Sequence, residues 1–274
     1  MGGAGASSYA SGMQVRGPVL VTGASSGIGA ALAEQFARAG HPLLLVARDR
    51  TRLDAAAAHF RRAHGVPVQV LALDLCEPHA AELVVAEAGR SGMLPVQVLV
   101  NNAGFGLVGG FAQTSPDEID AMIRLDVTVL VRLTRLLLPG MLAARDGRIL
   151  NVASTAAFQP GPFMAIYYAA KAFVLSFGEA LAHELRGSGV TATTLCPGPV
   201  RTRFQERAGL EGFAFVQGPL LQDVETVARV GYRAAMRGRR VAVPGLLNRF
   251  GTILGRFAPR ALVLRSIARM QSSR

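Results

Sequence analysis

Seven short apolar runs rich in β-branched residues alternate with six longer segments of helical periodicity, and this alternation constrains the fold most. The runs that predict strands are Val19–Thr22, Leu43–Ala47, Val68–Leu73, Val96–Asn101, Arg148–Ala153, Val190–Leu195 and Arg240–Val243. The segments that predict helices are Ile28–Ala39, Thr51–His64, Pro78–Gly89, Pro116–Arg145, Ala165–Leu185 and Asp223–Met236. Such alternation is typical of βαβ units, whose strands pair in parallel. We therefore predict an α/β fold with a single doubly wound, seven-stranded parallel sheet.

The composition predicts one large domain with an extension at each end. Of 274 residues, 50% are hydrophobic, which is enough to fill a substantial core. Residues 1–17 are rich in Gly, Ser and Ala, which predicts a flexible N-terminal tail rather than a signal peptide. The sheet-forming domain is expected at 18–244 and a C-terminal appendage at 245–274. Cys76 and Cys196 lack metal-type spacing, so we expect a reducing, cytoplasmic compartment and no metal site. The longest uncharged run, 91–116, contains Asn101-Asn102 and five glycines, so no transmembrane segment is expected.

Positive charge is concentrated in the C-terminal part of the chain. Residues 1–225 carry 18 basic and 18 acidic side chains, whereas 226–274 carry eleven arginines and no Asp or Glu, which accounts for the net charge of +11. Apolar residues recur there at helical spacing on both sides of Pro259: Leu246, Leu247, Phe250, Ile253, Leu254, Phe257, Leu262, Val263, Ile267 and Met270. Basic amphipathic helices suit an anionic membrane surface, so peripheral membrane contact through 246–270 is one expectation. The alternatives are packing over a pocket or at a subunit interface; without a groove-reading motif, no nucleic-acid binding is expected.

A glycine-rich turn directly follows the first predicted strand and opens the first predicted helix. Glycines at such a turn allow close backbone approach, and a helix N-terminus favours an anionic diphosphate. The turn therefore predicts a dinucleotide site. Its residues that we expect to contact the cofactor are Gly23, Ser25, Ser26, Gly27, Ile28 and Gly29.

The end of the second predicted strand distinguishes between the two nicotinamide cofactors. A carboxylate there would bind the ribose 2′-hydroxyl of NAD(H), but this chain has Ala47-Arg48. A guanidinium group matches a 2′-phosphate bidentately, so we expect NADP(H) to be preferred, with NAD(H) as a second cofactor. Asp49 follows directly and would weaken that preference, while Arg52 either assists or is simply solvated.

Lys171 is the only lysine among 29 basic residues, and it stands four positions after Tyr167. Residues i and i+4 of a helix share a face, so the ammonium and the phenol can address one small volume. A cation about 5 Å from the phenol, at an effective dielectric near 20, lowers its pKa by about two units. Such a phenol can exchange a proton with a substrate oxygen. The alternative is an ordinary helix pair with a half-buried Tyr and a solvated Lys.

The motifs together resemble the short-chain dehydrogenase/reductase family over residues 18–244. They are Thr22–Gly29, Asn101-Asn102-Ala103-Gly104, Ser154, Tyr167-x-x-x-Lys171 and Pro197-Gly198, in this order. The resemblance implies a Rossmann-like sheet with the order 3-2-1-4-5-6-7 and a homodimer or homotetramer. It also implies reversible hydride transfer between a nicotinamide cofactor and a carbonyl or alcohol.

The resemblance also implies roles for individual residues. Tyr167 would be the general acid/base, Ser154 would hold the substrate oxygen, and Lys171 would lower the pKa of Tyr167 and bind the nicotinamide ribose. Tyr168 is the rival candidate, but its spacing to Lys171 and Ser154 does not fit. The further residues expected at the cofactor are Asp74, Leu75, Asn101, Ala103, Gly104, Pro197, Gly198, Val200 and Thr202.

One position departs from the family pattern. Members usually carry a catalytic Asn in the helix before the serine strand, where it holds a water of the proton relay, and this chain has Asp126 there. A carboxylate would accept from such a water and could pair with Lys171, so Asp126 is included among the catalytic residues. The alternative is that Asp126 is merely tolerated and the relay is slower.

Aromatic and aliphatic residues gather in the segments expected to frame the substrate, which predicts a hydrophobic carbonyl or alcohol substrate. They are Phe105, Leu107, Ala156, Ala157, Phe158, Phe163, Met164, Phe204, Phe213, Phe215 and Leu220. Residues 203–222 are expected to form a lid. Carbonyl reduction is the favoured direction; alcohol oxidation and a redox-sensing nucleotide-binding protein without turnover are the alternatives.

Overall fold

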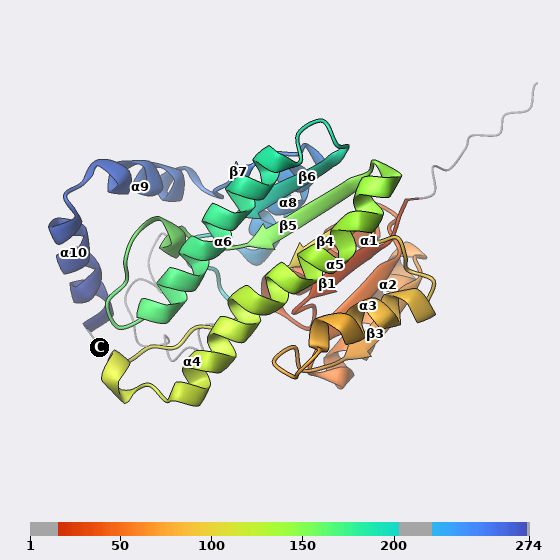
Figure 1. Cartoon of the computed structure of the whole chain (residues 1–274), viewed down its shortest axis with the longest axis horizontal. Helices are drawn as coiled ribbons and strands as arrows, with labels where there is room; N and C mark the ends of the chain where they lie inside the picture. The colour runs from red at the N-terminus through yellow and green to blue at the C-terminus, as the bar shows by residue number, and fades with distance from the viewer. Residues whose placement is uncertain (1–15, 203–220, 273–274) are drawn as a thin grey trace, which may run out of the picture.

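The computed structural model describes residues 16–202 and 221–272. Its strands form one parallel sheet in the order β3-β2-β1-β4-β5-β6-β7, as Figure 1 shows. The predicted fold class and strand order are therefore confirmed. The strands are β1 (Val19–Thr22), β2 (Leu43–Ala47), β3 (Val68–Ala72), β4 (Val98–Asn101), β5 (Gly147–Val152), β6 (Val190–Leu195) and β7 (Val241–Ala242).

Helices cover both faces of the sheet, which explains why β1, β2 and β4 are apolar except at the terminal Thr22 and Asn101. One face is covered by α1 (Gly27–Arg38), α2 (Arg50–His64) and α8 (Val224–Met236). The other is covered by α3 (Ala80–Arg90), α5 (Val129–Ala144) and α6 (Ala165–Glu184). A strand that is buried on both faces has no side in contact with solvent. Its residues are therefore hydrophobic in an unbroken run and do not alternate with polar residues.

The strand order reverses between β1 and β4, and this reversal determines where a ligand can bind. The chain builds β1, β2 and β3 in one direction and then returns to place β4 on the other side of β1. The connections after β1 and β4 therefore leave in opposite directions and open a crevice at the carboxyl ends of the strands.

The predicted helix Pro116–Arg145 is continuous but contains an irregular turn. It consists of α4 (Pro116–Ile123), the π-helical segment η2 (Arg124–Thr128) and α5. The whole helix is long and apolar enough to cross a membrane by length and composition, a test that core helices of soluble proteins also pass. Here Leu133, Leu137 and Met141 of α5 pack in the buried cluster against the sheet.

Two helices follow the last strand, as the amphipathic pattern predicts. They are α9 (Leu246–Phe257) and α10 (Arg260–Ser272), and the break between them falls at Pro259. Figure 1 shows both, in blue, at the same end of the molecule as α4 and far from α2 and α3. The predicted N-terminal tail up to residue 15 and the predicted lid up to residue 220, with its phenylalanines, lie outside the described residues.

Candidate active site

A cavity of about 480 Å³ lies at the carboxyl ends of the strands, where the strand order reverses. Most of the predicted site residues line this one cavity: Gly23, Ser25, Ser26, Gly27, Ile28, Arg48, Asp74, Leu75, Ala103, Gly104, Ser154, Tyr167, Lys171, Pro197, Gly198, Val200 and Thr202. Three predicted residues, Gly29, Asn101 and Asp126, lie behind its wall. Segments as far apart in sequence as Gly23 and Thr202 thus converge on a single volume.

The glycine turn between β1 and α1 has room for backbone but not for side chains. A Cβ atom on Gly29 would stand 2.4 Å from the Gly23 carbonyl oxygen and 2.3 Å from Asn102 Nδ2. Gly23 adopts φ 67°, a left-handed conformation that favours glycine. No side chain caps the N-terminus of α1, whereas Asp49 and Asp223 cap α2 and α8. The uncapped amides beside this cavity fit an anionic diphosphate.

Asn102 fixes the position of this turn, a function that the sequence reasoning did not assign to it. Its Nδ2 donates to the Thr22 carbonyl oxygen at 2.9 Å, and its backbone N–H donates to Thr22 Oγ1 at 3.0 Å. The neighbouring Asn101 has a different task, because its Nδ2 donates to Thr134 Oγ1 and Asn151 Oδ1 in the core. Asn101 is buried there and does not line the cavity, contrary to its prediction as a cofactor contact.

Arg48 lies on the cavity wall at the end of β2, and its side chain is 63% exposed. Its Nη1 stands 3.5 Å from Asp74 Oδ2, a loose ion pair that leaves most of the guanidinium available. Asp49 instead accepts from the Arg52 backbone N–H at 3.1 Å and pairs with Arg52 Nε at 3.0 Å. Asp49 and Arg52 therefore neutralise each other at the start of α2, which leaves Arg48 as the cation at the end of the strand.

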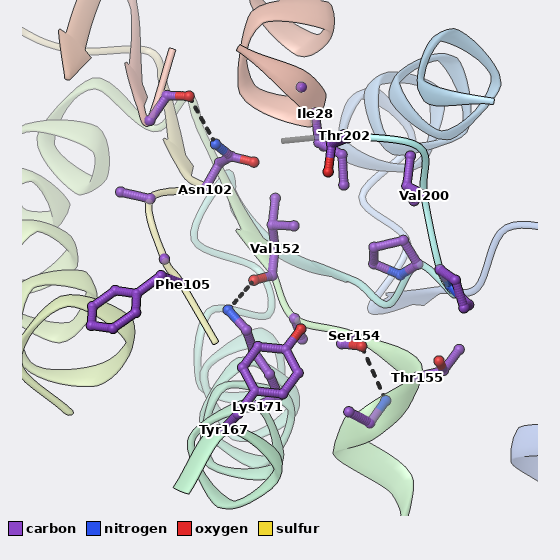
Figure 2. Close-up of a pocket in the computed structure, with 18 of the residues that line it drawn as sticks. Ile28, Asn102, Phe105, Val152, Ser154, Thr155, Tyr167, Lys171, Val200 and Thr202 are labelled. Carbon is purple, nitrogen blue, oxygen red and sulfur yellow. Dashed lines mark hydrogen bonds between the residues drawn. The ribbon is translucent and has the colours of Figure 1, made fainter. Parts of the chain in front are cut away.

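Lys171 and Asp126 form an ion pair in the floor of the site. Lys171 Nζ stands 2.9 Å from Asp126 Oδ2, and the two side chains are 7% and 0% exposed. Lys171 Nζ also donates to the Val152 carbonyl oxygen at 3.4 Å, and Asp126 Oδ1 accepts from the Phe105 backbone N–H at 3.0 Å. Figure 2 shows Lys171 and Tyr167 rising from the same helix, α6. The predicted pairing of Asp126 with Lys171 is confirmed.

Glycine is required beside this pair as well. A Cβ atom on Gly104 would stand 2.8 Å from Asp126 Oδ1 and 3.0 Å from Oδ2. The motif Asn101-Asn102-Ala103-Gly104 therefore ends in glycine because the Asp126 carboxylate lies directly against the backbone. Asp126 itself is on the π-helical segment η2, whose widened turn brings the carboxylate to this loop.

The Tyr167 phenol stands above this pair, with Lys171 Nζ 5.6 Å from its ring centroid. Burial raises the pKa of Tyr167 and Asp126 adds to this, while Lys171 and a hydrogen bond with Ser154 lower it. The net pKa lies above its ordinary value, so the predicted net lowering is wrong in this structure. The reason is that desolvation is large and that the Lys171 charge is shared with Asp126.

The Lys171 ammonium stays protonated despite its burial. Desolvation lowers its pKa, but the charges of Asp126 and Tyr167 and the hydrogen bond to Asp126 outweigh it, so that the pKa is raised. The site therefore contains a fixed cation directly beneath a protonated phenol.

Ser154 lies at the end of β5, where it begins the short 3-10 helix η3 (Thr155–Phe158). Its Oγ accepts from the Ala156 backbone N–H at 3.1 Å. This bond uses an acceptor position of the hydroxyl, whose proton is left to donate to a neighbouring oxygen. Ser154 and Tyr167 thus present two hydroxyl groups to the same part of the cavity (Figure 2).

The C-terminal helices form part of the cavity wall. Packing over a pocket is one of the three alternatives that their sequence pattern allows. Gln271 Nε2 on α10 donates to the Tyr168 hydroxyl at 2.8 Å, and Gln271 is buried. The spacing of apolar residues predicts the helices, but no local signal predicts which of their residues line a cavity. Those residues are Leu247, Asn248, Gly251, Thr252, Ile267 and Met270.

Comparison with known proteins supplies close relatives. A family model described as short chain dehydrogenase matches residues 18–212. The chain is 40% identical over 188 residues to the sulfoacetaldehyde reductase of Chromohalobacter salexigens, which covers 68% of this chain and 73% of that reductase. Other curated relatives are 32–35% identical, and the matched segment covers 51–76% of their length.

Two solved structures resemble the chain over nearly its whole length. A short-chain dehydrogenase from Sphingobium yanoikuyae in complex with NADPH superposes with a TM-score of 0.79 at 37% identity, covering 90% of this chain and 95% of that one. A bulky-bulky ketone specific alcohol dehydrogenase from Comamonas testosteroni superposes with a TM-score of 0.75 at 30% identity, covering 95% and 96%.

Replacing Asp126 by Asn is predicted to lower the pKa of Tyr167. The change removes a charge that raises this pKa and releases Lys171, whose charge lowers it. Ultraviolet titration of tyrosinate measures the shift, with the Tyr167→Phe protein as the reference that identifies the Tyr167 signal. Asp120→Asn, at an exposed position on α4, is the control and leaves the titration unchanged. An unchanged or higher Tyr167 pKa in Asp126→Asn would contradict this account of the site.

Proposed function

This chain belongs to the short-chain dehydrogenase family, and we propose that it transfers hydride between NADP(H) and a hydrophobic carbonyl or alcohol, with carbonyl reduction as the favoured direction. The observation that carries the proposal is the convergence of Ser154, Tyr167 and the Lys171–Asp126 pair on the cavity that the glycine turn also lines. A phenol, a hydroxyl and a fixed cation are the groups needed to bind and protonate a substrate oxygen.

In the proposed mechanism, the Ser154 hydroxyl donates a hydrogen bond to the carbonyl oxygen and holds it against the Tyr167 phenol. Tyr167 then gives its proton to that oxygen as the alcohol forms. The nicotinamide cofactor supplies the hydride when bound. Lys171 holds its positive charge beneath the phenol, which limits the cost of the phenolate left behind.

The favoured direction follows from the state of Tyr167. Because its pKa is raised by burial, the phenol is protonated at neutral pH and is ready to act as an acid. Asp126 contributes by holding Lys171 in position and by sharing its charge. Alcohol oxidation, the reverse reaction, needs the phenolate and is therefore the second candidate.

The substrate class is proposed from the cavity wall. Beside the reactive hydroxyls it contains Phe105, Met164, Leu247, Ile267 and Met270. Apolar walls with few convergent polar groups favour an apolar ligand. The names of the relatives differ on this point, since sulfoacetaldehyde is small and charged whereas a bulky-bulky ketone is neither. Because the cavity wall is apolar, we propose a substrate that resembles the bulky ketone rather than sulfoacetaldehyde.

Turnover of 2-ketones of increasing chain length with NADPH is the first test. We expect kcat/KM to rise with chain length, and Tyr167→Phe to lower kcat by about 100- to 10,000-fold because it removes the proton donor. Tyr168→Phe, which also lines the cavity but lacks the proposed role, is the matched variant and is expected to change kcat less than tenfold. A preference for short charged carbonyls would refute the substrate class. Cofactor binding without any turnover would instead favour a nucleotide-binding protein.

The preference for NADP(H) is proposed to depend on Arg48. Arg48→Ala is expected to raise the KM for NADPH by about 10- to 100-fold and to leave that for NADH nearly unchanged, because a charged hydrogen-bond donor to the 2′-phosphate is lost. Steady-state kinetics with both cofactors measure the ratio. Arg50→Ala removes a similarly exposed arginine outside the cavity and serves as the control. Equal effects of Arg48→Ala on NADPH and NADH would contradict the proposal.

We also propose that the enzyme contacts anionic membranes from the cytoplasmic side through α9. Its outer surface exposes Leu246, Phe250, Leu254 and Phe257, at 75%, 68%, 72% and 83%. An apolar face of this kind normally has a partner. The residues after 225 carry only positive charge, which favours an anionic lipid surface over a neutral partner. Homodimer or homotetramer formation, which the family resemblance implies, remains a separate expectation.

Sedimentation with phosphatidylserine-containing vesicles, compared with phosphatidylcholine alone, tests the membrane contact. The protein is expected to bind the anionic vesicles, and the double change Phe250→Ser and Leu254→Ser is expected to abolish binding. Phe111→Ser, which removes an exposed apolar residue elsewhere, is the control. Absence of vesicle binding would refute the membrane contact. A mass by light scattering that falls from oligomer to monomer in the double variant would assign the face to subunit contact instead.

A further inference from the structure

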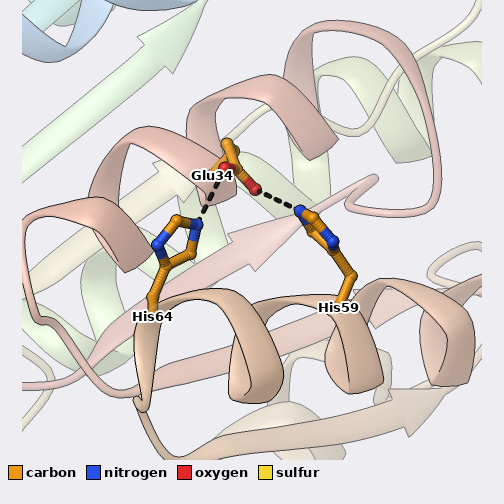
Figure 3. A group of neighbouring side chains, drawn as sticks. All are labelled: Glu34, His59 and His64. Atoms are coloured by element: carbon orange, nitrogen blue, oxygen red, sulfur yellow. Dashed lines mark hydrogen bonds and ion pairs between the residues drawn. The ribbon is translucent and has the colours of Figure 1, made fainter.

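A cluster of metal-ligating side chains lies on the opposite half of the molecule from the C-terminal helices, between α1 and α2. It consists of Glu34 on α1 and of His59 and His64 on α2, as Figure 3 shows. His64 Nε2 stands 2.8 Å from Glu34 Oε1, and His59 Nε2 stands 3.3 Å from Glu34 Oε2. None of the three residues lines the cavity of the candidate active site.

The three side chains are close enough to share one metal ion. Zinc binds imidazole nitrogen and carboxylate oxygen at about 2.0–2.2 Å, which places neighbouring ligand atoms about 3.3 Å apart. The two imidazole nitrogens face different oxygens of the Glu34 carboxylate, and one ligand atom from each residue lies within 4.8 Å of the others. A small shift of His59, whose side chain is 53% exposed, would bring the three ligand atoms to zinc-binding distances.

The carboxylate at the centre of the cluster has a partner on each oxygen. Its Oε1 contacts His64 Nε2 and accepts from Arg38 Nε, and its Oε2 contacts His59 Nε2. The Glu34 side chain is only 11% exposed, and it stands between the two imidazole rings (Figure 3). A buried anion that faces two imidazole nitrogens forms a donor set of two nitrogens and one oxygen, which suits Zn²⁺.

Among the described residues, Arg38 is the arginine that competes for this carboxylate. Its Nε donates to Glu34 Oε1 at 2.9 Å from the next turn of α1, but its side chain is 59% exposed. An exposed guanidinium can swing into solvent at little cost. Arg38 therefore reduces metal affinity without closing the site.

We propose that Glu34, His59 and His64 form a Zn²⁺ site that joins α1 to α2, with a fourth position open to water. The ion would replace the two imidazole–carboxylate contacts with bonds to one centre. The glycine turn leads into α1 and Arg48 lies just before α2, so the ion would join the two helices that begin beside these predicted cofactor contacts. The site is separate from the proposed oxidoreductase chemistry and does not depend on it.

Calorimetric titration of the tag-free, metal-stripped full-length protein with ZnCl₂ tests the site. We expect one Zn²⁺ per chain, and an increase in Tm of about 5 °C at a hundredfold excess over Kd, because the ion binds only the folded state. Glu34→Gln and His59→Gln are each expected to weaken binding at least tenfold, as loss of even an outer partner does in known sites. His183→Gln, an exposed histidine outside the cluster, is the matched control and keeps the wild-type affinity.

A change at Arg38 distinguishes a metal site from a histidine–carboxylate cluster that has only a structural role. Arg38→Gln removes the competing charge and is expected to tighten Zn²⁺ binding about fivefold. Arg50→Gln, which breaks a similar exposed i,i+4 ion pair with Asp54, is expected to change nothing. His59 is exposed, so His59→Gln is expected to fold even if Glu34→Gln does not. Zn²⁺ binding that is absent, or that is equally strong in wild type and His59→Gln, would overturn the proposal.

Discussion

The buried ion pair between Lys171 and Asp126 is the interaction on which the site depends. The pair joins α6, the helix that carries Tyr167, to the π-helical segment η2. Asp126 also accepts a hydrogen bond from the Phe105 backbone N–H, which adds the loop after β4. The bond from Lys171 to the Val152 carbonyl oxygen adds the end of β5. Removing one partner of such a buried pair costs about 3–5 kcal/mol, since the other charge is left without compensation. One pair of charges therefore holds together the elements that surround the reactive end of the cavity.

Much of this arrangement follows from the sequence because it is encoded in periodicity and spacing. The alternation of strands and helices, the glycine turn and the i,i+4 relation of Tyr167 and Lys171 all follow from local patterns, whereas the strand order follows from the family resemblance. The π-helical turn does not, because nothing around Asp126 distinguishes a widened turn from a regular one. The direction of the Tyr167 pKa was missed for a related reason. Spacing identifies the nearby cation, but neither the burial nor the shared charge of that cation is visible before the chain is folded.

The C-terminal helices have an inner face and an outer face with different surroundings. Their pattern left membrane contact, pocket cover and subunit interface open. In the structure, Ile267 is buried on the cavity wall while Phe250 faces outward, so the inner and outer faces are free to serve different purposes. The Glu34, His59 and His64 cluster was missed altogether because its ligands come from two helices and lack a metal-binding motif. Only the packing of α1 against α2 brings them together.

We infer that a guanidinium cannot replace the ammonium of Lys171. The test is kcat/KM of Lys171→Arg with NADPH and a long-chain ketone, with folding checked by circular dichroism. Arginine keeps the positive charge but needs a wider planar space than the buried position beside Asp126 provides. We expect kcat/KM to fall at least about a hundredfold in a protein that is still folded. Activity near that of the wild type would show that a guanidinium serves equally well at this position.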